Sequence, residues 1–326
     1  MPRHLTKLIL LLALVLPARG EGLPTFEDFR RVDRMRRMTG QLQTAELLDV
    51  SRIDVQRLIA AAQKNPADWQ LQWGAAETLV EWPNKRAFFE SALQASGTNI
   101  AIVARYALFA AQNRDREVAL PWLHHLQKKE TDNIVPWLAE LWLLVRQPPG
   151  SPVPSDDIQK LHPAMWATNF RDYAASAARA RVRLLEAAGY TPYSARRLAF
   201  MPDIPAPLCA RDLMTTTVKE EAGRDILEKS ARAMQTGAPF LLYEFIGQSL
   251  ETALMQSKPL AGTGAEARLR SIELESRRDD LKALLARVEQ NVIDIATEQE
   301  MVRYFDDVLT FGEENALRRL LTAAGR

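Results

Sequence analysis

The 326-residue sequence contains one cysteine, Cys209, and four histidines. A single thiol excludes an internal disulfide, so the fold must be held together by its hydrophobic core. Lysines and arginines number 42 against 41 aspartates and glutamates. This balance argues against a dedicated nucleic-acid-binding protein, which would carry a basic excess. No segment shows the period-two alternation of a half-buried strand, and its absence favours an all-α fold.

Several signatures of catalysis and metal binding are also missing. The sequence has no Gly-rich phosphate loop, no Gly-x-Ser-x-Gly motif, no Ser-x-x-Lys and no His-Glu-x-x-His. His124 and His125 are adjacent, so on a helix they point about 100° apart and cannot share one metal ion. We therefore expect no cofactor and no metal site. We interpret Cys209 as a small buried apolar residue rather than a nucleophile.

The N-terminus has the features of an export signal. Arg3 and Lys7 precede a short apolar core at residues 8–16, and Ala18 and Gly20 offer small residues at a cleavage site. This core is too short to span a bilayer, which requires about 20 apolar residues. We expect residues 1–20 to be a signal peptide, and a single thiol fits export to a bacterial periplasm.

A pattern repeats between residues 65 and 146. Asn65, Thr98 and Asp132 each precede an apolar helical run, at a spacing of about 33 to 34 residues. In the first unit, Asn65 is the expected N-cap and Pro66 the first helical residue. The spacing predicts an all-α stack of helical hairpins.

The repeat units resemble the tetratricopeptide repeat (TPR) family. The matching features are the period, the capped helix starts, an aromatic residue early in the first helix (Trp69), and an aromatic and then a small residue in the second (Phe89 and Ala92). The resemblance covers residues 65–146 only. It implies an α-solenoid with a concave surface that binds a peptide or protein segment.

The sequence departs from the TPR family at two positions. Trp73 stands where the family has a small residue in the first helix, and Gly74 follows one place late. Gly97 stands where the family favours proline.

Prolines mark the clearest boundary in the chain. Residues 147–155 include four prolines and a glycine, which cannot continue a helix and predict a stiff connector. We expect a helical-repeat domain at residues 21–146 and a second helical domain at residues 156–326. In the second domain, Thr297 and Glu300 match a capping box and predict a helix start.

Most of the seven tryptophans lie in the repeat region. Trp69 and Trp73 fall on a predicted apolar stripe and are expected in the core. Trp82 and Trp137 fall off the stripes, so we predict that they anchor a partner. The remaining predicted binding residues are His124 and His125, which would border a groove or face solvent.

The leading functional hypothesis is a non-catalytic, exported helical-repeat scaffold that binds a protein or peptide in the bacterial cell envelope. The alternative is a cell-envelope hydrolase with a cleft in the C-terminal helical half. Its candidate carboxylates are Glu244 and Glu251, seven residues apart on one predicted helix. A solvated helix face is the simpler interpretation of these two residues.

A third hypothesis concerns the first helix, which is rich in arginine. These basic residues could contact an anionic membrane surface: Arg30, Arg31, Arg34 and Arg37. Glu27, Asp28 and Asp33 lie among them, so a solvated face is again the simpler interpretation. No later segment is long and apolar enough to be a transmembrane helix.

Overall fold

The computed structural model describes residues 22–39, 53–146, 155–200, 204–209, 213, 221–257, 264–292 and 295–323. Throughout these ranges the regular elements are helices, which confirms the all-α prediction. Extended backbone pairs in an isolated parallel bridge between Asn133 and Asn169. None of the described helices combines the length and apolarity needed to cross a bilayer. The predicted signal peptide and residues 147–154 of the predicted connector lie outside the described residues.

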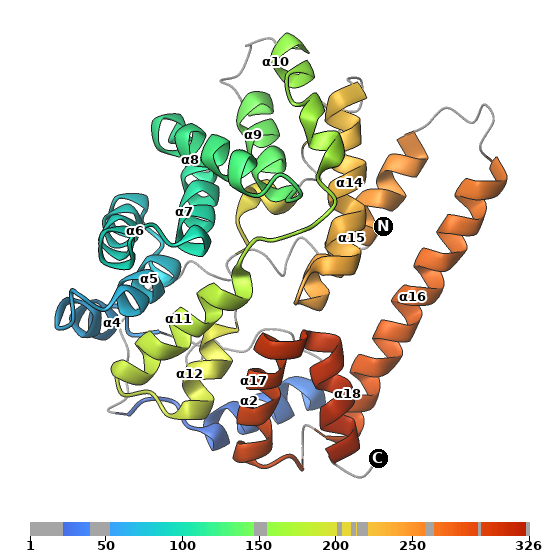
Figure 1. Cartoon of the computed structure of the whole chain (residues 1–326). Coiled ribbons are helices and arrows are strands. Elements are labelled where there is room, and N and C mark those ends of the chain that lie inside the picture. The colour runs from blue at the N-terminus through green and yellow to red at the C-terminus, as the bar shows by residue number, and fades with distance from the viewer. Residues whose placement is uncertain are drawn as a thin grey trace.

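Residues 55–146, which include the predicted repeat region at 65–146, form consecutive helices that stack side by side along the left of Figure 1. Their bounds are α4 (Val55–Gln63), α5 (Trp69–Thr78), α6 (Trp82–Ser96), α7 (Ile100–Gln112), α8 (Arg116–Lys129) and α9 (Val135–Val145). Side-chain caps set several starts, because Asp68, Asn99 and Asp115 accept backbone N–H hydrogen bonds from α5, α7 and α8. Pro83 lies in the first turn of α6, where its missing N–H is not needed.

The predicted helix starts at Asn65 and Thr98 were wrong by three residues and by one residue. Asp68 caps α5, and Asn65 instead donates to the carbonyl of Ala61 at the end of α4. Asn99 caps α7, while Thr98 lies in the preceding turn with a φ of 70°. The apolar pattern therefore predicted where these helices lie. It did not identify their N-caps, because each helix start has two neighbouring polar residues that could cap it.

The third predicted start, at Asp132, is capped from one residue further on. The first turn of α9 follows Ile134, which makes no side-chain cap. Instead the Asn133 side-chain oxygen accepts from the backbone N–H of Val135 at 3.1 Å.

The second half of the chain packs against this stack through some of its elements and extends away from it with the others. Its elements are α10 (Ser155–Gln159), η1 (His162–Trp166), α11 (Ala174–Ala187), α12 (Pro192–Ala199), η2 (Ala206–Cys209), α14 (Glu221–Gly237), α15 (Leu241–Ser257), α16 (Gly264–Asn291), α17 (Glu298–Phe311) and α18 (Glu313–Ala323). The early helix α2 (Phe26–Thr39) lies with α17 and α18 at the bottom of Figure 1. The predicted capping box forms between Thr297 and Glu300.

Two glycines permit the closest helix contacts. A Cβ at Gly74 would lie 2.5 Å from the carbonyl oxygen of Ala180, so α11 packs directly against α5. A Cβ at Gly247 would lie 2.5 Å from the carbonyl oxygen of Ala231, and α14 packs against α15 in the same way. Gly74, which stands one place late for the TPR pattern, thus serves the contact with α11.

One apolar core joins the two halves of the chain. It contains Leu108 of α7 and Leu138 of α9 together with Leu227 of α14 and Tyr243 of α15. The predicted domain boundary at residues 147–155 therefore falls between segments that pack into a common core.

Candidate functional site

Trp82 is fixed at the start of α6. The side chain is half-buried, and its ring centroid lies 6.0 Å from that of Tyr106. The indole Nε1 donates to Asp115 Oδ2 at 3.1 Å. Trp82 thus joins the first turn of α6 to the N-cap of α8 and presents only part of its ring to solvent.

Helix α8 carries both predicted histidines. His125 is half-buried and meets the ring of Trp122 edge-on, with centroids 6.0 Å apart. His124 is more exposed, with 51% of its side chain accessible, and its Nε2 lies 3.1 Å from Glu140 Oε1 on α9. Trp122 is half-buried as well and was not among the predicted binding residues, although its spacing from His125 on one helix face is a readable signal.

Trp137 lies one turn before Glu140 on α9. Its side chain is half-buried against the core, and its Nε1 has no hydrogen-bond partner within the described residues. Gln127 of α8 also donates to Glu140 at 2.6 Å. The structure therefore brings His124 and the first turns of α9 together, whereas Trp82 belongs to the neighbouring α6–α8 contact.

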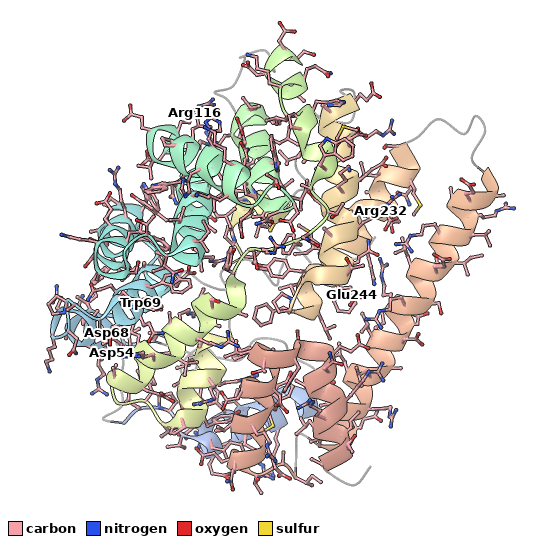
Figure 2. The ribbon with its side chains drawn as sticks, in the orientation of Figure 1. Asp54, Asp68, Trp69, Arg116, Arg232 and Glu244 are labelled. Carbon is pink, nitrogen blue, oxygen red and sulfur yellow. The ribbon has the colours of Figure 1, made fainter. Side chains whose placement is uncertain are left out.

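We call these five side chains the outer surface: Trp82, Trp122, His124, His125 and Trp137. They come from α6, α8 and α9, and the arrangement offers partly exposed aromatic rings in fixed positions. Figure 2 shows Arg116, at the start of α8, and Trp69, at the start of α5, on the same side of the molecule. Trp69 and Trp73 stack on each other. Trp73 is buried, as predicted for a core residue, whereas Trp69, also predicted in the core, is only partly buried at its edge.

Glu244 and Glu251, the carboxylates of the hydrolase hypothesis, are both buried on α15 and paired with arginines of α16. Arg277 Nε donates to Glu244 Oε1 at 2.7 Å, and Arg270 Nε donates to Glu251 Oε1 at 2.9 Å. The interpretation as a solvated face was wrong, because α16 covers both carboxylates. Both oxygens of each carboxylate accept hydrogen bonds from the facing arginine, so the two glutamates pair α15 with α16 rather than converge on one site.

The spacing of these ion pairs follows from the sequence. Glu244 and Glu251 are seven residues apart, and Arg270 and Arg277 are also seven apart, so antiparallel helices bring both pairs into register. Between them, Arg278 Nε lies 3.5 Å from Gln248 Oε1. We call this set of contacts the α15–α16 ionic seam.

A second group of charges lies deep in the fold. Arg105 of α7 donates to both carboxylate oxygens of Glu77 on α5, at 2.9 and 2.7 Å. Trp73 Nε1 donates to the same carboxylate at 3.0 Å. Lys85 of α6 is buried, with its Nζ 3.5 Å from the ring centroid of Phe109.

Asp172 extends this group toward the C-terminal helices. Its Oδ2 lies 3.7 Å from Arg105 Nη1 and accepts a hydrogen bond from the Tyr243 hydroxyl of α15. Its Oδ1 accepts from the backbone N–H of Ala174 in the first turn of α11, at 3.1 Å. We call these residues the buried charge network, which joins α5, α6, α7, α15 and the start of α11: Trp73, Glu77, Lys85, Arg105, Asp172 and Tyr243.

The two carboxylates of the network differ in their affinity for protons. Burial alone would raise the pKa of Glu77, but the charge and hydrogen bonds of Arg105 outweigh it, so that pKa lies below its ordinary value. Burial dominates at Asp172 and raises the pKa of that carboxyl despite the nearby Arg105. Burial also raises the pKa of the Tyr243 hydroxyl, so Tyr243 stays protonated and donates to Asp172.

Cys209 and the arginines of the first helix, the other residues considered from the sequence, lie outside the outer surface. Cys209 in η2 is partly buried and interacts electrostatically with Tyr243. On α2, Arg31 lies 3.4 Å from Asp28, and Arg30 lies 3.8 Å from Glu27. No cluster of three or more His, Cys, Asp or Glu side chains within the described ranges has the geometry to hold a metal ion.

Comparison with protein-family models, with curated proteins and with solved structures yields no match for this chain.

Proposed function

We propose that this protein is an exported helical-repeat scaffold that binds a protein or peptide partner in the bacterial cell envelope through its outer surface. The proposal combines the predicted export signal and the TPR-like period of the sequence with the partly exposed aromatic rings on α6, α8 and α9. The observation that carries it is the set of tryptophans held partly exposed in fixed positions, of which Trp82 is secured by Asp115.

The inner side of the stack is already covered by the chain itself. Helix α11 packs on α5 and reaches α7, η2 packs on α7 and α9, and α14 packs on α9. Every residue of α7 from Ala101 to Ala111 is buried, by α11 and η2 together with the neighbouring helices α6, α8 and α9. A concave peptide groove of the kind that the TPR resemblance implies would need this face, so we assign the partner to the outer surface instead.

Aromatic anchors of this kind suit recognition of another protein. Tryptophan is enriched among residues that dominate binding energy, because a rigid ring buries a large apolar area at little entropic cost. Anchors that are held in place before binding lose less conformational entropy on association. His124 and Glu140 add a polar edge next to Trp137, and a polar border around apolar anchors is typical of protein interfaces.

Site-specific crosslinking in cells tests this proposal. We would place a photo-crosslinking amino acid at position 124 of the full-length chain and identify what is captured. We expect one dominant protein or peptide. We also expect Trp137→Ala to lower its yield by at least about tenfold, the effect typical of a binding hot spot.

Two controls distinguish binding at the outer surface from non-specific binding. Trp166 is 73% exposed and lies in η1, outside the outer surface, so Trp166→Ala should leave capture unchanged. A crosslinker at Lys282, which is exposed on α16, should not capture the same partner. Equal capture from positions 124 and 282, or full capture by Trp137→Ala, would contradict the proposal.

A further inference from the structure

Helix α16 changes its mode of attachment along its length. Between Gly264 and Arg278 it is joined to the body mainly by the α15–α16 ionic seam, and Leu274 is its one buried apolar side chain in this half. From Leu281 onward the buried side chains among the described residues of this helix are apolar. These side chains pack with Leu317, Leu320 and Leu321 of α18: Leu281, Leu284, Val288 and Val292.

Figure 1 shows α16 as a long helix along one edge of the molecule, with its N-terminal half beside α15 and its C-terminal half beside α18. The outward face of the first half carries Leu269 and Ile272, which are 63% and 59% exposed. The first half therefore contacts the body on one side only. Figure 2 shows Glu244 on the side of α15 that faces α16.

The two halves respond differently to water and salt. Separating the apolar half exposes leucine and valine side chains, which water solvates poorly. Separating the ionic half hydrates arginine and glutamate side chains, so the lost attraction is largely replaced by solvation. Arg270 and Arg277 are already more than one third exposed in the closed arrangement, and salt screens such pairs.

We propose that residues 264–278 of α16 form a reversible arm, held closed on α15 by the ionic seam, while residues 281–292 stay anchored on α18. Arg277 marks the junction, because it contacts Glu244 of α15 and also Glu314 of α18 at 2.5 Å. Opening of the arm uncovers the face of α15 that carries Glu244, Gln248 and Glu251. A segment with few buried apolar contacts and many solvated polar ones is the kind that opens locally while the rest of a protein stays folded.

Distances between spin labels on the full-length chain test the arm. In a Cys209→Ser background, one label is placed at Thr236 on α14 and the second at Leu269 on the arm, both exposed positions. The matched control pair uses Thr236 and Ala286, an exposed residue on the anchored half. We expect narrow distributions for both pairs at low salt. At about 1 M salt, where the Debye length is about 3 Å, only the Leu269 pair should broaden and lengthen.

A charge variant provides the second measurement. The Glu244→Gln/Glu251→Gln variant removes both carboxylates with little change in shape, so the Leu269 pair should broaden already at low salt. A Leu269 pair that stays as narrow as the Ala286 pair in both experiments would overturn the proposal. Equal broadening of both pairs would overturn it too, since the whole helix would then detach without an anchored half.

Discussion

Glu77 and Asp172 face different nitrogens of the Arg105 guanidinium, and their hydrogen-bond partners differ. Glu77 receives two short hydrogen bonds from Arg105 and one from Trp73. Asp172 lies 3.7 Å from the same guanidinium and relies on Tyr243 and the N–H of Ala174. A buried carboxylate stays charged at low cost only when its partners replace the lost water. Glu77 meets this condition more fully than Asp172.

This difference predicts opposite effects of two isosteric substitutions at neutral pH. Glu77→Gln leaves Arg105 without its bidentate partner, and we expect a loss of about 3 kcal/mol or more in the free energy of unfolding. Asp172→Asn keeps one oxygen, which can still accept from the N–H of Ala174, and places an NH2 group opposite the Tyr243 hydroxyl, which can turn to accept from it. It also removes a charge that burial disfavours. We expect a change of no more than about 1 kcal/mol, in either direction. Urea denaturation followed by circular dichroism measures both.

The same network predicts the pH dependence of stability. The pKa of Asp172 is raised on folding, so the folded state binds its proton more tightly, and stability from this group increases as pH falls through the raised pKa toward the ordinary 3.8. The pKa of Glu77 is lowered, so its contribution is complete above the ordinary 4.5 and is lost as pH falls through the lowered value. The wild type should therefore gain stability relative to Asp172→Asn as the pH is lowered toward 3.8. A difference between the two proteins that does not change with pH would contradict the raised pKa of Asp172.

No local sequence signal pointed to this network. Arg105 and Glu77 are 28 residues apart, and Tyr243 and Asp172 are 71 apart, so only the packing of α5, α7 and α15 brings them together. The ionic seam is different, because the seven-residue spacing of Glu244 and Glu251 recurs in the arginines of α16. Complementary charges at equal spacing on two predicted helices were a signal for an antiparallel pair.

At the scale of single elements, the helix termini show which features can be predicted from neighbouring residues alone. The capping box at Thr297 was predicted and forms, since both of its hydrogen bonds lie within four residues. The sequence predicts starts at Asn65 and Thr98, whereas Asp68 and Asn99 are the caps, and in each case the two capping-type residues lie within one turn. Propensity alone cannot rank such neighbours, and the tertiary contacts of the helix decide the position.

The contact between α5 and α11 depends on a residue without a side chain. Gly74→Ala would place a Cβ 2.5 Å from the backbone oxygen of Ala180 and 2.9 Å from Leu184 Cβ, so the two helices would have to move apart. Overpacking of this kind costs about 1–3 kcal/mol and sometimes more. We therefore expect Gly74→Ala to lower the free energy of unfolding by at least about 1 kcal/mol. Thermal and urea denaturation measure this loss.

Gly237→Ala is the matched control for that substitution. A Cβ at Gly237 would meet its nearest atoms at 3.7 Å or more, which is ordinary van der Waals contact. Gly237 ends α14, so alanine should change stability little. Equal stability of Gly74→Ala and Gly237→Ala would show that α5 and α11 do not approach as closely as the structure has them.

At the scale of the whole molecule, the outer surface and the arm lie on different parts of one packed body. The proposed binding residues belong to α6, α8 and α9, and the arm belongs to α16. The buried charge network runs between the stack and α15.

The all-α class could be predicted from hydrophobic periodicity, because that signal is local. The covering of α5 by α11 could not, because it depends on contacts between residues about 100 positions apart.

The sequence predicts two domains separated by residues 147–155, and a truncation distinguishes this arrangement from a single cooperative unit. In the structure, α11 covers α5, and Leu108 and Leu138 share a core with Leu227. Removal of residues 147–326 would expose these faces, at a cost of about 1.5–3 kcal/mol for each fully buried large apolar side chain. Several such side chains would exceed the total stability of about 5–15 kcal/mol that is typical of a folded protein.

We therefore expect the fragment of residues 21–146 to lack a cooperative unfolding transition, whereas the chain of residues 21–326 should unfold in one step. Circular dichroism in the near ultraviolet, which reports the packing of the tryptophans concentrated in this fragment, measures the difference during a urea titration. Adding the separate fragment of residues 156–326 should restore the near-ultraviolet signal, because it supplies α11 and α14. A fragment of residues 21–146 that unfolds cooperatively by itself would instead establish the repeat region as an independent domain, with the contact to α11 as an interface between domains.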